Sequence, residues 1–530
     1  MPQPNALSPD SALYRNSNIS KRLEPLFLVE SARIPVTNLM SGSPISARPA
    51  TPNAPRFRWT YPRILFLCFV FSLPMVNPIV HGDGVGYYAY ARAPLIQHNL
   101  HFEEDWRHGN LYFAQSRVRA DGTLQPEEYT GTGYVSNLFA VGPAILWFPF
   151  LFLAHLLVLL CNFLGAHILP NGFSFPYILA MAIGTAVYGF LGLLLAFSLA
   201  RKYVAERWAF LATLGIWFAS SLPVYMYFNP AWSHAHSAFV VALFLWYWES
   251  SRPNRTSAQW LLLGLISGLM VDVYFPNGVF LLLPLIESLW AYSSYRSSGI
   301  RAARHLFFQN LLFIFAIIVA LVPTFITRKI IFGGYLRFGS YPHLAWDWTA
   351  PNWRAVLFSS DHGLLSWTPL LGLALLGLLV PPRHARAIAF YFATAAVAFY
   401  YLIASYPYWD GLASFGNRFF ISLTPIFVFG LALFLSFVSQ HISSPRNSVA
   451  LLSGVLLCFA CWNFGFIFQW GAHLIPVRGP ISWSEMIHNQ FVVVPREISA
   501  QVRNYVFRRR SLMRQIEQRD VEQLNKSAQP

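Results

Sequence analysis

The sequence has few charged residues. Asp, Glu, Lys and Arg make up 11% of its 530 residues and hydrophobic residues make up 55%, whereas about 25% of the residues in typical soluble domains are charged. This shortage of charge excludes an ordinary soluble globular protein. Instead, apolar runs long enough to cross about 30 Å of hydrocarbon recur along the chain. We therefore expect an all-α, polytopic integral membrane protein.

Cysteine is also scarce. The four cysteines, Cys68, Cys161, Cys458 and Cys461, fall within or at the ends of apolar runs, which excludes a disulfide framework of the kind found in small secreted domains. Cys458 and Cys461 have the spacing of a C-x-x-C motif. In an apolar helix we expect them to be packed side chains and not a metal or redox site.

Acidic residues are outnumbered by basic ones, 22 to 37, which gives a net charge of +15. A charge of this size can attract nucleic acid, but here the basic residues lie mostly between apolar segments and in the two tails, which is how membrane topology is encoded. We therefore expect no nucleic-acid partner. Residues 1–60 are rich in Ser, Pro, Asn and Arg and have little apolar periodicity, which predicts a disordered cytoplasmic tail.

The apolar runs predict about eleven transmembrane helices between residues 61 and 475. They cover 62–80, 176–200, 207–228, 236–250, 258–274, 276–293, 306–327, 364–380, 387–404, 419–438 and 449–470.

A further apolar run, 137–161, decides the topology. If it does not cross and the N-terminus is cytoplasmic, eleven Lys and Arg residues fall in short cytoplasmic loops, as the positive-inside rule requires. If it does cross, those loops face outwards. We therefore predict that 137–161 is a juxtamembrane helix in the outer leaflet, within a first extracytoplasmic loop of residues 81–175.

The C-terminal tail, residues 476–530, predicts a basic amphipathic helix. Its apolar residues follow helical spacing, while arginines crowd the other positions; the apolar residues are Ile498, Val502, Tyr505, Val506, Met513 and Ile516. Eleven crossings place this tail outside, where so many arginines break the charge rule. Either the helix rests on outer-leaflet lipid or the crossing count is wrong by one, so the side of the tail stays open.

The segment His81–Tyr90, with the sequence HGDGVGYYAY, is the strongest candidate for a reaction centre. It directly follows the first apolar run, so Asp83 lies where a membrane helix re-enters water. A carboxylate there can meet a lipid-borne substrate on one side and a water-soluble partner on the other. The glycines let the backbone turn sharply, and Tyr87 and Tyr88 either line a site or anchor the membrane interface.

The predicted topology brings four polar stretches to one outer aqueous face. They are 81–136, 229–237, 328–363 and 406–420. His234 lies in the second stretch, Asp361 and His362 in the third, and Arg418 in the fourth. Since these stretches are far apart in sequence, their common side is the main argument for a site that the sequence itself provides.

Three of these features resemble the membrane glycosyltransferases of the GT-C superfamily, which include protein mannosyltransferases and aminoarabinose transferases of lipid A. The features are an Asp in a Gly- and Tyr-rich stretch after the first crossing, Ser233-His234-Ala235 at the outer end of the third, and the segment Trp409–Arg418, WDGLASFGNR, entering a late helix. The resemblance covers residues 62–475 and rests on order and spacing.

The resemblance implies an inverting enzyme that transfers a sugar from a polyprenyl-phosphate carrier to a lipid, glycan or protein acceptor. It implies an extracytoplasmic active site, which we expect on a bacterial cytoplasmic membrane. Asp83 would be the general base, and Arg418 would bind the donor phosphate. His234 would be a second phosphate donor or, with Asp83, a ligand of a possible divalent metal ion. The expected substrate-lining residues are Tyr87, Tyr88, Trp409 and Asp410. The sequence leaves open the sugar, the acceptor, the lipid length and the oligomeric state.

Each role has a structural alternative. Asp83 could cap the next helix, Arg418 could extend to lipid headgroups, and His234 could satisfy backbone carbonyls at a helix break. The chain also has Asp272 where the family often has a basic residue. A lipid-linked-sugar transporter or flippase, or a non-catalytic subunit, is the alternative function. The gathering of polar residues at one face, and not through the bilayer midplane, favours the enzyme.

Overall fold

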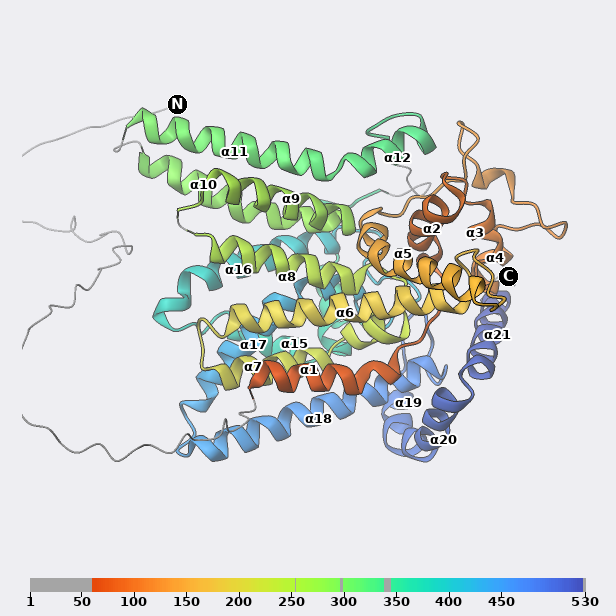
Figure 1. Cartoon of the computed structure of the whole chain (residues 1–530). Coiled ribbons are helices and arrows are strands. Elements are labelled where there is room, and N and C mark those ends of the chain that lie inside the picture. The colour runs from red at the N-terminus through yellow and green to blue at the C-terminus, as the bar shows by residue number, and fades with distance from the viewer. Residues whose placement is uncertain (1–59, 253, 296–298, 338–344, 528–530) are drawn as a thin grey trace, which may run out of the picture. The chain divides into compact units, whose positions relative to one another are not determined.

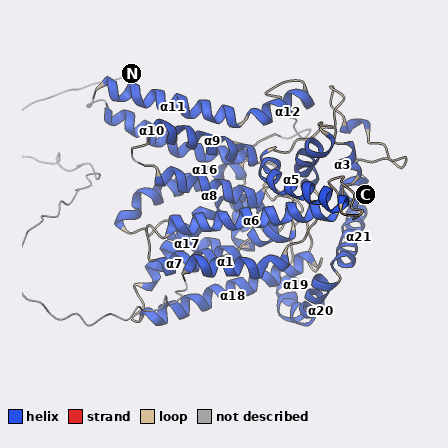
Figure 2. Ribbon diagram, in the orientation of Figure 1, coloured by secondary structure: helices blue, strands red, loops and turns tan. Residues whose placement is uncertain are grey.

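The computed structural model describes residues 60–252, 254–295, 299–337 and 345–527, which belong to one compact unit. Helices make up the regular structure of these residues, and no β-strand occurs among them (Figure 1, Figure 2). The all-α class predicted from the sequence is therefore confirmed. Apart from Thr60, the predicted N-terminal tail lies outside the described residues.

The helices of the apolar region follow the predicted runs. They are α1 (Tyr61–Ser72), α6 (Phe175–Ala200), α7 (Glu206–Phe218), α8 (His234–Ser250), α9 (Ser257–Val273), α10 (Leu282–Tyr295), α11 (Ile300–Ala320), α12 (Val322–Phe332), α14 (Leu364–Trp367), α15 (Leu370–Gly377), α16 (Arg386–Ala404), α17 (Thr424–Ser439) and α18 (Pro445–Gly471). The first loop holds α2 (Asp83–Arg92), α3 (Glu103–Arg107), α4 (Leu111–Gln115) and α5 (Gly142–Phe163), and α13 (Trp353–Phe358) precedes α14. The C-terminal region forms α19 (Trp483–His488), α20 (Val494–Phe507) and α21 (Arg509–Ser527).

Six helical segments in the described part of the chain are long and apolar enough to cross a membrane: Gly142–Phe163, Phe175–Ala200, Ile300–Ala320, Arg383–Ala404, Arg418–Ser439 and Pro445–Gly471. The protein is thus a polytopic membrane protein. Other predicted crossings are broken into shorter helices, often at proline. Pro74 lies in a short turn after α1, and Thr368, just before Pro369, leaves the helical conformation between α14 and α15. Proline lacks the backbone donor and disfavours a helical residue before it, which explains both breaks.

Helix α5 corresponds to the run that decides the topology. Trp147 donates to Thr185 at 2.8 Å, and His155 hydrogen-bonds the Tyr177 hydroxyl at 2.7 Å, so α5 runs antiparallel to α6. In this register about ten residues of α6 extend beyond the start of α5, a displacement of about 15 Å at the helical rise per residue. Helix α5 is long enough to cross, but this displacement fits the juxtamembrane placement, which stays a prediction.

All four cysteines are free thiols, in agreement with the expected absence of a disulfide framework. Cys458 and Cys461 were expected to be packed, and that expectation is wrong. Both are exposed on α18, which turns one apolar face away from the rest of the bundle. A face that meets hydrocarbon needs no packing partner to be stable in a membrane.

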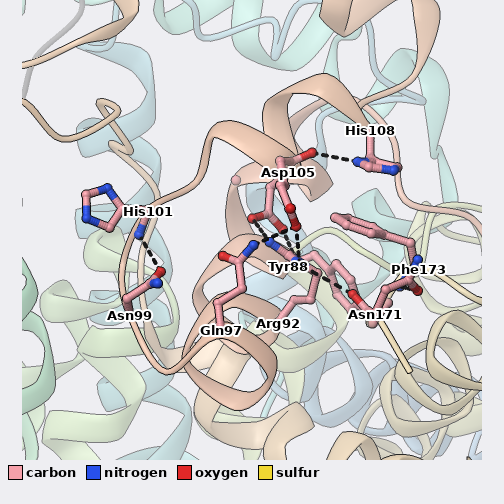
Figure 3. Close-up of polar contacts among 12 residues, drawn as sticks. Tyr88, Arg92, Gln97, Asn99, His101, Asp105, His108, Asn171 and Phe173 are labelled. Atoms are coloured by element: carbon pink, nitrogen blue, oxygen red, sulfur yellow. Dashed lines mark hydrogen bonds and ion pairs between the residues drawn. The ribbon is translucent and has the colours of Figure 1, made fainter. Parts of the chain in front are cut away.

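The C-terminal end of α2 is held by a closed polar network (Figure 3). Arg92 donates to both carboxylate oxygens of Asp105, each at 2.7 Å, and lies 3.3 Å from both Glu104 and the backbone oxygen of Asn171. Its guanidinium stacks 4.3 Å from the Phe173 ring. Burial raises the pKa of the Asp105 carboxyl, and the bonds from Arg92 oppose that rise. The network fixes the helix that presents the candidate base at its other end.

The C-terminal helices pack at the end of the bundle where α2 to α4 lie (Figure 1). The Tyr505 hydroxyl on α20 donates to the backbone oxygen of Met75 at 2.6 Å. The Glu517 carboxylate on α21 accepts a bond from the Leu111 backbone at 2.6 Å. The tail is therefore docked on the protein through specific polar contacts.

Candidate active site

A cavity of about 820 Å³ opens beside the start of α2. Its walls come from the turn after α1, the segment before α8, the segment entering α17, the C-terminal end of α18, and helices α20 and α21. Both Asp83 and Arg418 line it. A volume of this size is typical of a site for a small molecule or the head of a larger one.

Asp83 and Arg418, which are 335 residues apart in sequence, form an ion pair on the cavity wall. The Arg418 Nη1 donates to the Asp83 Oδ2 at 2.7 Å. The Asp83 side chain is 35% exposed and that of Arg418 is 11% exposed. Asp83 also lies in the first turn of α2, where the helix dipole favours negative charge. The structure thus brings the two leading candidates into contact, at the end of a helix that stabilises the carboxylate.

Trp232 links the two sides of this ion pair. The Arg418 guanidinium lies 4.3 Å from the Trp232 ring, and the indole nitrogen donates to the backbone oxygen of His81 at 3.0 Å. Gly82 has a φ of +55°, and a Cβ there would lie 3.3 Å from the indole. Glycine therefore allows the turn before Asp83 to pass close to Trp232.

Arg418 has donor capacity beyond the bond to Asp83. Its Nε is buried and has no hydrogen-bond partner among the described residues. Guanidinium can bind a phosphate through two nitrogens at once. The contacts with Asp83 and Trp232 hold the side chain on the cavity wall, which distinguishes it from an arginine that extends to lipid headgroups.

His234 is buried behind this wall. Its ring lies edge-on to the rings of Tyr225 and Tyr274, and its centroid is 5.0 Å from the first and 5.7 Å from the second. The residue is 4% exposed. It does not line the cavity with Asp83 and Arg418. Its predicted part in phosphate or metal binding therefore depends on movement of these aromatic neighbours and stays a prediction.

None of the four predicted substrate-lining residues is among the residues that form the cavity walls. Tyr87 and Tyr88 are buried within α2, and the Tyr88 hydroxyl donates to the backbone oxygen of Gly172 at 2.6 Å. Trp409 and Asp410 are half-buried in the segment that leads to Arg418. Their direct contact with substrate stays a prediction.

The C-terminal helices supply wall residues that the sequence did not assign to a site. All six apolar residues of the predicted amphipathic pattern line the cavity: Ile498, Val502, Tyr505, Val506, Met513 and Ile516. The helical spacing correctly identified one apolar face. That face turns to the cavity, whereas the sequence offered only lipid or a different crossing count as explanations.

Asp272, where the family often has a basic residue, is fully buried. It accepts a hydrogen bond from the Thr324 hydroxyl, which ties α9 to α12. A structural pairing of this kind accounts for an acid near a helix end. Asp272 does not line the cavity.

No family model and no curated protein matches the chain. Among solved structures, the chain is similar to the crystal structure of ArnT from Cupriavidus metallidurans in the apo state. The identity is 13%, the match covers 77% of this chain and 70% of that chain, and the TM-score is 0.42. The functional conclusion therefore rests on the residues of the site.

Proposed function

We propose that this protein is a membrane glycosyltransferase of GT-C type. It moves a sugar from a polyprenyl-phosphate carrier to a lipid, glycan or protein acceptor on the extracytoplasmic side of the membrane. The observation that carries the proposal is the 2.7 Å ion pair of Asp83 and Arg418 on the cavity wall. It joins a possible base and a possible phosphate ligand, the two groups that this reaction needs.

Asp83 acts as the general base in this proposal. The acceptor hydroxyl oxygen attacks the anomeric carbon of the sugar, and its proton passes to the Asp83 carboxylate. The bond between the anomeric carbon and the phosphate oxygen breaks, and its electron pair leaves with the lipid phosphate. A single displacement of this kind inverts the anomeric centre.

Arg418 binds the leaving phosphate. Negative charge grows on that group as the bond breaks, and a fixed guanidinium stabilises it without reorganisation. Before the donor binds, the guanidinium is paired with Asp83. A phosphate carries more charge than one carboxylate and can engage two guanidinium nitrogens, so it competes for Arg418. Donor binding thereby releases Asp83 to accept the proton.

The apolar part of the cavity suits the lipid of the donor. Val502 and Val506 on α20 face the same cavity as Phe464 and Phe468 on α18. Burying isoprenoid carbon against such side chains contributes about 25 cal/mol per Å² of apolar area. The carrier lipid would then lie between the bundle and the C-terminal helices, with its phosphate near Arg418.

The test is sugar transfer in proteoliposomes supplied with a lipid-linked donor and a candidate acceptor. We expect Asp83→Asn to fold and insert normally but to lower turnover by about 10²- to 10⁴-fold, the usual worth of a general base. Asp121→Asn, at an exposed loop carboxylate, is the matched control and should transfer sugar normally.

Near-normal turnover by Asp83→Asn would contradict the assignment of Asp83 as the general base. If neither wild type nor variant transfers sugar but both move the lipid-linked sugar between leaflets, the protein is a transporter.

A further inference from the structure

A second cluster of chemically active side chains lies outside the cavity wall. It forms where the turn between α13 and α14 meets the segment that leads to α17. The His362 Nδ1 lies 3.3 Å from the Asp361 Oδ1. One ligand atom from each of Asp361, His362 and Asp410 lies within 4.8 Å of the others. None of the three is a proton acceptor or phosphate ligand in the proposed reaction.

His362 is the most informative member of this cluster. It is fully buried, and neither of its ring nitrogens forms a hydrogen bond of good geometry among the described residues. The ring packs against Trp367, with centroids 4.7 Å apart. A buried imidazole whose nitrogens form no hydrogen bond of good geometry costs free energy, so its retention calls for an explanation.

The two carboxylates give the cluster negative charge. A carboxylate oxygen of Asp361 and one of Asp410 lie within 4.8 Å of each other, so their negative charges repel. The Asp361 Oδ1, which points toward the imidazole, has no hydrogen-bond partner among the described residues. A cation between these groups would relieve the repulsion and satisfy the unbonded atoms together.

We propose that Asp361, His362 and Asp410 bind one divalent transition-metal ion, with zinc as the best fit. One imidazole nitrogen and two carboxylate oxygens suit zinc or manganese better than magnesium, which prefers oxygen alone. At zinc–ligand distances of about 2.0–2.1 Å, neighbouring tetrahedral ligands lie about 3.3–3.4 Å apart. The distance from His362 to Asp361 already has this value, and three protein ligands leave a fourth position for water.

This metal ion has a positioning role. It joins two segments that are distant in sequence, one of which continues from Asp410 through Gly411 to the cavity wall. A Cβ added at Gly411 would lie 3.4 Å from Arg418 side-chain atoms, so the backbone beside the metal ligand passes close to that arginine. Fixing Asp410 therefore fixes the backbone that lies next to Arg418.

The experiment measures metal binding by purified, untagged full-length protein in detergent, without donor or acceptor. After treatment with a chelator the protein is titrated with zinc, manganese or magnesium, and bound metal is measured by mass spectrometry. We expect about one zinc per chain and a rise in the unfolding temperature when zinc is added. Asp361→Asn, Asp410→Asn and His362→Gln should each weaken zinc binding about 100-fold or more, since loss of a supporting residue alone costs 10- to 100-fold.

Asp121→Asn is again the matched control, because it removes an exposed carboxylate elsewhere, and it should bind zinc like wild type. His362→Gln changes a buried residue, so the two carboxylate variants carry the test if that variant fails to fold. The site is also supported if wild type binds manganese instead of zinc and the same variants lose manganese binding. The proposal is overturned if wild type binds neither ion, or if folded carboxylate variants bind zinc as wild type does. Because the readout contains no sugar transfer, it can fail independently of the proposed activity.

Discussion

The two ends of α2 carry arginine–aspartate pairs with opposite physical character. At its C-terminal end Arg92 and Asp105 are 1% and 2% exposed and share two hydrogen bonds of 2.7 Å. At its N-terminal end Asp83 and Arg418 share one bond of 2.7 Å, and the Asp83 side chain is 35% exposed on a cavity wall. The same two residue types thus form one buried pair that shares two hydrogen bonds and one partly exposed pair that shares a single bond. The two pairs lie about 14 Å apart along one helix.

The difference indicates that the inner pair, Arg92 and Asp105, stabilises the fold, whereas the outer pair, Asp83 and Arg418, is suited to bind substrate. A buried charge that has lost its water needs every partner, so the inner pair has no capacity for a ligand. The outer pair retains solvent, and Arg418 keeps an unbonded Nε. Such a pair can exchange its partner for a substrate group at modest cost. We infer that the inner pair holds α2 in place so that the outer pair can react.

The largest expected effect is that of Arg418→Gln on sugar transfer. Turnover should fall by about 10⁴-fold, because an arginine that stabilises charge growing on a phosphate contributes about 10³–10⁵-fold in phosphoryl-transfer enzymes, and the leaving phosphate here gains charge in the same way. Thermal unfolding should change little, since the remaining Asp83 carboxylate can be solvated from the cavity. Turnover in proteoliposomes and unfolding temperature in detergent are measured on the same preparation.

Arg418→Lys is the matched variant for this prediction. It keeps the charge but loses the two-pronged geometry, so its turnover should lie between those of wild type and Arg418→Gln. If Arg418→Gln instead unfolds readily and transfers sugar well when folded, the outer pair is structural and the comparison fails.

The second effect is that of Arg92→Gln on stability. The free energy of unfolding should fall by about 3–5 kcal/mol, because Asp105 is left as an uncompensated buried charge. The measurement is thermal or denaturant unfolding in detergent. Turnover of the fraction that stays folded should be much less affected than in Arg418→Gln.

The control for this change is the double variant with Asp105→Asn. Since the amide carries no charge, the double variant should recover more than half of the lost stability, and the double-mutant cycle should give a coupling of a few kcal/mol. Equal stability losses in the single and double variants would show that packing, and not charge, holds this end of α2.

The sequence pointed to Asp83 and Arg418 as site residues, but it did not indicate that Arg92 and Asp105 form a pair. Asp83 and Arg418 stood out because apolar runs and basic loops place both at one membrane face, and the GT-C resemblance added their roles. Arg92 and Asp105 occurred only among many loop charges, since partner choice in an irregular loop depends on tertiary packing. The helices were predictable from apolar runs, whereas their breaks depended on individual residues such as Pro369.

The roles of the tail and of His362 required the structure for different reasons. The apolar spacing of the tail predicts an amphipathic helix, but spacing does not say which apolar surface it covers. His362 was placed at the outer face, next to Asp361. Its contact with Asp410, about 50 residues later in the chain, depends on how two irregular segments meet, and no local pattern encodes that.

The smallest expected effect comes from an exposed pair, which tests whether burial is what distinguishes the two ends of α2. Arg201 and Glu206 lie 3.1 Å apart, and each side chain is 44% exposed. Arg201→Gln should lower the free energy of unfolding by about 0.5 kcal/mol or less, because water already screens both charges. That difference should shrink further at high salt. Unfolding of Arg201→Gln and Arg92→Gln is compared under the same conditions, with Lys202 left in place to preserve the basic loop. A loss as large as that of Arg92→Gln would mean that burial does not set the strength of these pairs, and the assignment of Asp83 and Arg418 as the exchangeable pair would lose its physical basis.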